Sequence, residues 1–185
     1  EVKIEAADSS KSIPTDAINA RESDNVLTLH GGLAKSARLR IRVPHKTDLS
    51  LKCVNCSEVT VSGVSASIDI DVVNGNIRLT NAGGSVVAHS LNGKVTANLD
   101  GLGTNPSSFS SMNGTVDITL PDDTKANVRL RTEHGKIHTD FELRLKGALR
   151  TDRGFEGTIN GGGPEIQARS FNGSIFLRKR SQSGK

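Results

Sequence analysis

The stretch IDIDVVNGNIRL, residues 68–79, sets the pattern of the whole chain. Aliphatic side chains alternate with polar ones up to the pair Asn74-Gly75, and the alternation resumes at Ile77. An alternation with period two is typical of a β-strand that has one buried face. The stretch therefore predicts two strands joined by a tight turn at Asn74-Gly75.

The same pattern recurs along the chain, with successive turn pairs 18, 21, 21 and 38 residues apart, the last interval equal to two periods of 19. The turns are Asn74-Gly75, Asn92-Gly93, Asn113-Gly114, His134-Gly135 and Asn172-Gly173, with a degenerate copy at Asn55-Cys56. A small or β-branched residue stands two positions before these turns, and aliphatic residues stand four and six positions before them. The exception is the turn at Asn113, which Phe109 and Ser107 precede at these positions. Recurrence at fixed offsets indicates a repeat architecture in which coils stack on one another.

Two architectures can be built from strand, Asn-Gly and strand. Asn-Gly is a strong hairpin signal, so an antiparallel meander or sandwich is the alternative fold. The repeating unit here is the whole strand pair, which favours coils that stack in parallel and align their Asn side chains into a ladder. We therefore predict an all-β fold, a parallel β-solenoid with Asn-Gly turns.

The length of 185 residues fits one domain, because a chain of this size buries about 70% of its unfolded surface on folding. We predict a single β-repeat domain over residues 1–185, with core repeats at about 37–179 and a polar tail at 180–185. An insertion at about 140–161 breaks the period and is expected to form a strand pair or a cap over one coil. With 5 Phe and no Trp or Tyr, the core must consist of small and β-branched aliphatic residues.

Charge and composition exclude some classes of partner. The net charge of +4 is mild, and the chain lacks the Trp and Tyr that stack on single-stranded nucleic acid. We therefore predict no nucleic-acid partner. No apolar run is long enough for a membrane span. A homo-oligomer is a further alternative, because the exposed edge strands of a solenoid can pair with those of a second copy.

The stretches NGGGPEI (residues 160–166) and RSFNGSI (residues 169–175) complete the pattern of aliphatic residue, Asn-Gly and alternating strand. Over about residues 37–179 the chain resembles a bacterial β-solenoid family of Asn-Gly repeat domains that carries an inferred adhesin label. The resemblance implies a right-handed β-helix-like fold and an extracytoplasmic location, in the periplasm, at the outer surface or secreted. It implies no catalytic residue and no cofactor. Cys56 in place of Gly and His134 in place of Asn depart from the family pattern.

Cys53 and Cys56 are the two cysteines of the chain, spaced Cys-x-x-Cys. A tetrahedral zinc site needs two further ligands, and no His shows a matching ligand spacing. A thioredoxin-like redox motif needs a helix N-terminus, whereas this pair spans a strand end and a turn. We predict no metal site and a structural role for the pair. In an oxidising compartment the two cysteines can form a disulfide across the turn.

Asp69 and Asp71 point to the same outward strand face, and Lys52 is expected beside Asp71 in the preceding coil. Polysaccharide lyases with a β-helix fold use Asp clusters for calcium and a Lys or Arg as base, so these three residues carry the enzymatic alternative. An exposed ion pair is the simpler explanation. The same outward position continues as His89, Ser110, Arg131 and Arg169, so no single chemistry accumulates along the stack.

The alternating residues Arg38, Arg40 and Arg42 form a basic stripe that is a weak candidate for binding acidic glycans or lipid headgroups. Charges that discourage edge pairing of a solvated strand explain it equally well. The sequence thus predicts a noncatalytic cell-envelope scaffold or adhesion-type binding module, with a surface glycan or protein as partner. The alternative is a polysaccharide-acting enzyme of lyase or hydrolase type.

Overall fold

The computed structural model describes residues 3–8, 18–23, 26–31, 37–145 and 154–180. These ranges contain 16 β-strands and no helix, which confirms the predicted all-β class. The chain divides into two compact units, Glu1–Pro44 and His45–Lys185. The assignment of all 185 residues to one domain stays a prediction.

The first unit contains two antiparallel strand pairs. They are β1 (Lys3–Asp8) with β4 (Ala37–Arg42), and β2 (Ile18–Ser23) with β3 (Val26–Gly31). The basic stripe predicted from the sequence lies on β4, where Arg40 is the register partner of Glu5 and Arg42 that of Lys3. The stripe is therefore a feature of the first unit and not of the repeats.

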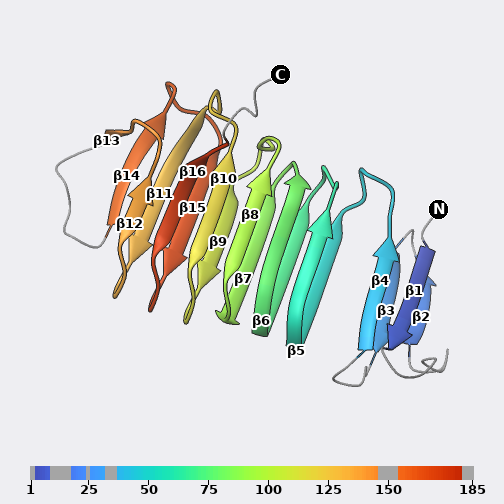
Figure 1. The fold of residues 1–185 in the computed structure, drawn as a ribbon. Coiled ribbons are helices and arrows are strands. Elements are labelled where there is room, and N and C mark those ends of the chain that lie inside the picture. The colour runs from blue at the N-terminus through green and yellow to red at the C-terminus, as the bar shows by residue number, and fades with distance from the viewer. Residues whose placement is uncertain (1–2, 9–17, 24–25, 32–36, 146–153, 181–185) are drawn as a thin grey trace. The chain divides into compact units, whose positions relative to one another are not determined.

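The second unit is a stack of coils, each consisting of a strand, a bend and a second strand (Figure 1). The long strands β5 (Leu49–Ser62) and β6 (Ile68–Ala82) run through the bend and form coils 1 and 2. Coil 3 is β7 (Val86–Asn92) with β8 (Val95–Leu99), and coil 4 is β9 (Ser107–Ser111) with β10 (Val116–Leu120). The inserted coil is β15 (Glu165–Ser170) with β16 (Ile175–Lys179), and the end coil is β11 (Ala126–Thr132) with β12 (Ile137–Thr139).

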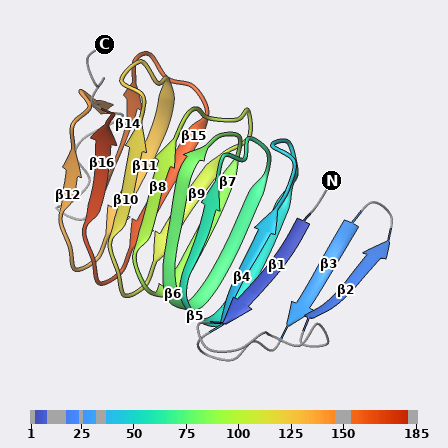
Figure 2. The same cartoon turned by 45° about the vertical axis from the view of Figure 1, so that its right-hand side comes forward.

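Neighbouring coils pair in parallel on both sides of the bend. We call the side built from the strands before the bend the β7 side, and the side built from the strands after it the β8 side (Figure 2). The β7 side has the order β5, β6, β7, β9, β15, β11, and the β8 side β5, β6, β8, β10, β16, β12. These parallel ladders confirm the β-solenoid architecture and exclude the antiparallel meander.

The core lies between the two sides of the stack. Most inward residues of the coils are aliphatic, as the alternating pattern predicts, and Phe109 is the largest fully buried side chain. The inward residues of β9 are the exception, with Ser107 and Ser111 on either side of Phe109. Among the buried residues are Ile68, Ile70, Ile77, Leu79, Ala88, Val95, Ile118, Leu130, Ile166 and Ile175. Away from the bends, buried residues alternate with outward-facing ones, so every second side chain of a strand points away from the core.

The inserted coil corrects the order of coils expected from the sequence. It comes last in the described sequence, yet it lies between coil 4 and the end coil, with β15 paired to β9 and β11, and β16 paired to β10 and β12. The outward row accordingly runs from Ser110 to Arg169 and only then to Arg131. The predicted insertion contributes β13 (Arg144–Leu145) and β14 (Gly154–Ile159), an antiparallel pair that extends the β7 side beyond β11.

Asparagine side chains form a continuous ladder along the bends. Each amide nitrogen donates to the amide oxygen of the neighbouring coil, over 2.7 to 2.8 Å, in the order Asn172, Asn113, Asn92, Asn74 and Asn55. The bend is not a hairpin turn, since Asn74 and Gly75 lie inside the single strand β6. His134 takes the ladder position in the end coil, and its ring packs edge-on against Phe171 at 5.1 Å between centroids.

A second ladder lies beside the first. The Ser or Thr two positions before the ladder residue donates its hydroxyl to the carbonyl oxygen of the glycine in the neighbouring coil. The pairs are Ser90 with Gly75, Ser111 with Gly93, Ser170 with Gly114 and Thr132 with Gly173, over 2.8 to 2.9 Å. These hydroxyls are buried, so the ladder satisfies polar groups that would otherwise be costly inside the fold.

Candidate functional site

The outward face of the β7 side carries a row of polar side chains that crosses six strands. In spatial order the row, which we call the central row, consists of Lys52, Asp71, His89, Ser110, Arg169 and Arg131. Each member is the register partner of the next, so the row spans five strand spacings, or about 24 Å. The row runs along the stack and across the strands.

Within the central row, the described contacts are few. His89 Nδ1 and Ser110 Oγ form a hydrogen bond of 2.7 Å. Lys52 and Asp71 are register partners, as predicted, but no ion pair joins them, and none involves Arg169 among the residues that the structure describes. Asp69, two positions before Asp71 on the same face, is also exposed. These four charged side chains are therefore directed to solvent.

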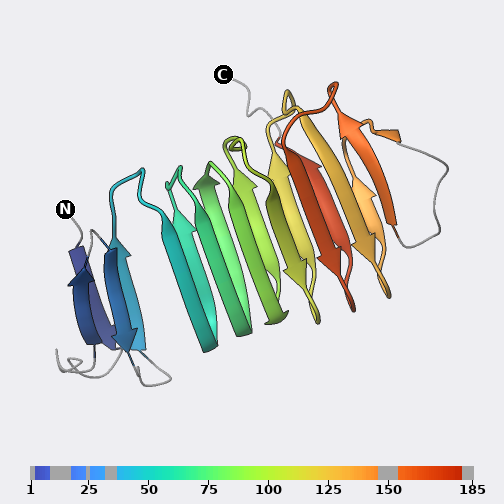
Figure 3. The same ribbon diagram turned by 180° about the vertical axis from the view of Figure 1, so that it is seen from behind.

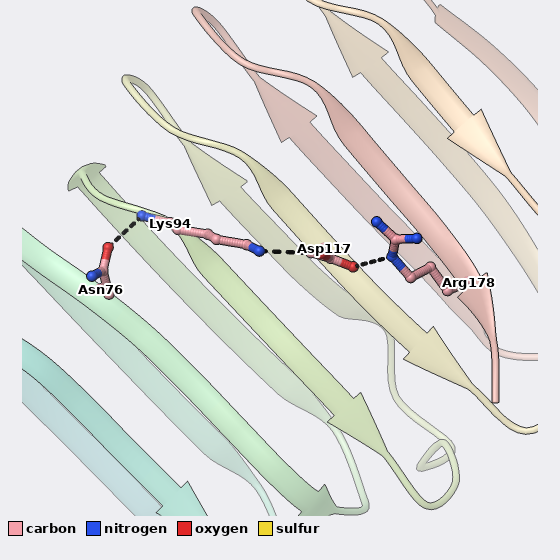
Figure 4. A network of polar contacts seen from close by, with 4 residues as sticks. All are labelled: Asn76, Lys94, Asp117 and Arg178. Atoms are coloured by element: carbon pink, nitrogen blue, oxygen red, sulfur yellow. Dashed lines mark hydrogen bonds and ion pairs between the residues drawn. The ribbon is translucent and has the colours of Figure 1, made fainter. Parts of the chain in front are cut away.

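Several charged side chains of the β8 side, by contrast, bind one another between neighbouring coils. Asp117 accepts from Lys94 Nζ at 3.2 Å and from Arg178 Nε at 2.9 Å, which links coils 3 and 4 and the inserted coil (Figure 4). The backbone nitrogen of Lys94 also donates to Asn76 Oδ1 in coil 2, at 2.9 Å. Between coils 1 and 2, Glu58 accepts from Arg78 at 3.1 Å. The charges of this side thus serve the cohesion of the stack.

Charges near the end of the stack on the β7 side are also paired. Arg129 donates to Glu156 of β14 at 2.8 Å and lies 3.7 Å from Glu165 of β15. Arg131, the last member of the central row, bonds to Glu133 at 2.9 Å. Among the described residues, the members of the row without an ion-pair partner are therefore Lys52, Asp71 and Arg169, whereas His89 and Ser110 bond to each other.

An apolar ridge borders the central row along the bends. The residue directly before each ladder Asn is apolar, and these residues are Val54, Val73, Leu91, Met112 and Phe171. The bends stack in register, with the backbone nitrogen of Asn172 donating to the carbonyl oxygen of Met112 at 2.8 Å. Val54 is 62% exposed, Met112 46% and Phe171 42%. The ridge was not predicted above, although its signal is present in the sequence as an apolar residue that recurs directly before each Asn of the ladder.

The two cysteines are joined in a disulfide that closes the bend of coil 1, with their Cα atoms 6.1 Å apart. Sulfurs bonded to each other cannot bind zinc as thiolates. Within the described ranges, no group of three or more His, Cys, Asp or Glu side chains could hold a metal ion. In the described part of the chain, Asp69 and Asp71 accordingly have no third carboxylate with which they could form the calcium site of the enzymatic alternative.

Comparison with family models matches residues 45–178 to the description Toastrack DUF4097, which covers the coil stack of the second unit. No curated protein and no solved structure matches the chain. The part of the chain that the structure describes holds no helical segment of the length and hydrophobicity that a membrane span requires. The adhesin label of the family that the sequence resembles stays a prediction.

Proposed function

The chain belongs to the Toastrack DUF4097 family, and from this premise we propose that it is a noncatalytic binding module of the cell envelope that holds an extended surface polymer on its β7 side. The observation that carries the proposal is the contrast between the two sides of the stack. On the β8 side, charged residues of neighbouring coils pair with one another, as Asp117 does with Lys94 and Arg178. On the β7 side, several exposed charged residues have no ion-pair partner among the described residues, namely Lys52, Asp69, Asp71 and Arg169.

The rigidity of the stack suits this role. Side chains on paired strands are held about 4.8 Å apart, and the Asn and Ser ladders fix the bends. Because the row is already ordered, the protein loses little conformational freedom when a ligand binds to it. The polar row would hydrogen-bond the ligand, and the adjoining ridge of Met112 and Phe171 would cover its apolar parts.

A surface glycan is the ligand class that we favour. The row offers ammonium, carboxylate and guanidinium groups beside the hydrogen-bonded imidazole and hydroxyl of His89 and Ser110. Such groups donate to and accept from hydroxyls and charged sugar substituents. Location outside the cytoplasm is part of the proposal, and the disulfide between Cys53 and Cys56 supports it, because disulfides persist in oxidising compartments.

The test measures binding of the full chain to immobilised envelope polysaccharides and envelope proteins. Arg169→Ala and Asp71→Ala should each weaken the affinity on the order of tenfold, because a hydrogen bond to a charged group is lost. Arg78→Ala on the β8 side is the matched control and should leave the affinity unchanged. The proposal fails if wild type binds neither class, or if all three variants bind as wild type does; binding to proteins alone would replace the glycan by a polypeptide.

The enzymatic alternative rests on one specific observation, the register pairing of Lys52 with Asp71 and the position of Asp69 on the same face. A polysaccharide-acting enzyme of lyase or hydrolase type would shorten the polymer. Release of unsaturated or reducing ends that disappears in Asp71→Asn would favour this alternative over the binding module. A polymer of unchanged length after prolonged incubation would leave binding as the function.

A further inference from the structure

The inserted coil fills a place that the chain first leaves open. The chain builds coil 4, continues into the end coil and β14, and only then returns to lay β15 and β16 between the two (Figure 3). Without the inserted coil, β9 and β11 would face each other across a gap of two strand spacings, about 9 to 10 Å. Both edges of this gap would present unpaired backbone groups. We call this place the slot, and its two walls are strand edges with backbone groups free to form hydrogen bonds.

The contacts that hold the inserted coil come from residues far away in the sequence. Asn172 donates to Asn113, 59 residues earlier, and Ser170 donates to the carbonyl oxygen of Gly114, 56 residues earlier. On the other wall Thr132 donates to the carbonyl oxygen of Gly173, 41 residues apart. The coil also buries Ile166 and Ile175 in the core. None of these contacts requires that the coil and the slot belong to the same molecule.

The connection into the inserted coil is a short turn that can open. Residues 160–164 join β14 to β15, with positive φ angles of 47° at Asn160, 90° at Gly161 and 88° at Gly162. The Asn160 side chain holds the turn closed by donating to the carbonyl oxygens of Asp122 and Thr124, at 3.0 and 2.9 Å. Five residues in extended form reach about 17 Å. An opened turn can therefore carry the coil away from its own slot.

We propose that the inserted coil is an exchangeable element, and that two copies of this chain form a dimer in which each supplies the coil that fills the slot of the other. The exchanged dimer keeps both backbone ladders, both side-chain ladders and the buried Ile residues, and differs from the monomer only at residues 160–164. Exchange of an identical element is a low-cost route to a dimer, since most contacts are conserved. The partner is a second copy of this chain, and the proposal is independent of the glycan ligand.

The test places one cysteine on each side of the slot. Ser108 of β9 and Gln167 of β15 are register partners on the outward face, at a separation that a disulfide can span. Full chains with Ser108→Cys or Gln167→Cys, both in a background of Cys53→Ser and Cys56→Ser, are mixed, unfolded, refolded together at high concentration and oxidised. Exchange predicts a covalent dimer that contains one copy of each variant. Folded proteins that are merely mixed should give far less of it.

A matched pair of variants controls for random cross-linking. Val87 of β7 and Ser108 of β9 are also register partners, but both precede the opening turn, so exchange keeps them in the same molecule. Co-refolding Val87→Cys with Ser108→Cys should give little mixed dimer. Equal yields of mixed dimer from the two pairs would overturn the proposal, as would the absence of mixed dimer from both.

Deletion of Gly161 and Gly162 provides a second measurement. A shortened turn cannot return the coil to its own slot without distortion, so the variant should shift from monomer to dimer in size-exclusion chromatography with light scattering. A natively folded monomer would overturn the proposal. If the deletion prevents folding, the cysteine pairs decide, because they leave the turn intact.

Discussion

The glycines of the bends are required by close approach between coils. A Cβ atom added at Gly93 would collide with the carbonyl oxygen of Gly75, and one added at Gly114 would collide with that of Gly93. The same oxygens accept the hydroxyl bonds of the Ser ladder. A glycine at this position therefore lets two coils approach closely enough for both ladders to form.

Gly93→Ala should lower the free energy of unfolding by about 1–3 kcal/mol, because the neighbouring backbone must shift to admit the methyl group. The control is Gly101→Ala, since a Cβ at Gly101 meets nothing within 4 Å. That variant should be neutral or slightly stabilising. Equal losses in urea titrations of the two variants would contradict the close-approach explanation.

Substitution of an interior Asn of the ladder should lower the free energy of unfolding more than substitution of a terminal one. Asn92 both donates to Asn74 and accepts from Asn113, whereas Asn172 makes a single described ladder bond. At about 1 kcal/mol for each bond, Asn92→Ala should cost roughly twice as much stability as Asn172→Ala. Chemical denaturation of both variants measures the ratio, and a ratio near one would show that the ladder bonds do not contribute separately.

Among the elements, the inserted coil marks the limit of what sequence patterns predict. The period-two alternation and the constant offsets from Asn-Gly predict the strands, their inward residues and parallel stacking up to Asn113. They cannot predict that the Asn172 coil lies beside Asn113, because every coil presents the same inward pattern to either neighbour. The registration of Lys52 with Asp71 is likewise predictable, whereas the absence of a bond between them depends on side-chain conformations that a pattern does not encode.

The position of the inserted coil predicts its protection from hydrogen exchange. The amides of β15 and β16 lie between paired strands, whereas β12 pairs with β16 on one side and with no other described strand. Peptides covering 165–170 and 175–179 should therefore exchange more slowly than a peptide covering 137–139, since edge strands open at lower free energy. Mass spectrometry of the intact chain measures this order. Faster exchange of the inserted coil would show that it docks only loosely.

The disulfide should stabilise coil 1, whose strand β5 has a described strand partner on one edge only. A loop closed over so few residues stabilises a fold by about 2 kcal/mol in the chain-entropy model. The double variant Cys53→Ser, Cys56→Ser should therefore have a lower Tm than wild type under oxidising conditions. Reductant should lower the Tm of wild type to that of the variant and leave the variant unchanged.

At the scale of the whole stack, the two sides differ in how their charged residues are paired. On the β8 side, charged residues form ion pairs between coils. The side chain of Asp117, which bridges two cations, is only 14% exposed. On the β7 side, Asp69 and Asp71 are exposed and have no ion-pair partner among the described residues. An aspartate thus has a structural role on the β8 side, whereas on the β7 side the proposed function assigns Asp71 to the ligand.

Asp117→Asn should lower the free energy of unfolding by about 0.5–2 kcal/mol, the sum of two partly exposed ion pairs. Asp69→Asn on the β7 side should change it by no more than about 0.5 kcal/mol. In 1 M salt the two variants should differ less in their free energy of unfolding, because screening weakens the ion pairs of Asp117. A loss for Asp69→Asn as large as that for Asp117→Asn would contradict the division between the sides.

The Asn ladder also gives the stack a direction. All four amide bonds point the same way, so that Asn55 at one end accepts a bond and Asn172 at the other donates one. Aligned amide groups add their dipoles, as peptide groups do in a helix. The two ends of the ladder therefore differ in chemistry, with spare donor hydrogens at Asn55 and a spare acceptor oxygen at Asn172. The solenoid is in this sense a polar one-dimensional lattice, and the imidazole of His134 is the site at which its amide repeat terminates.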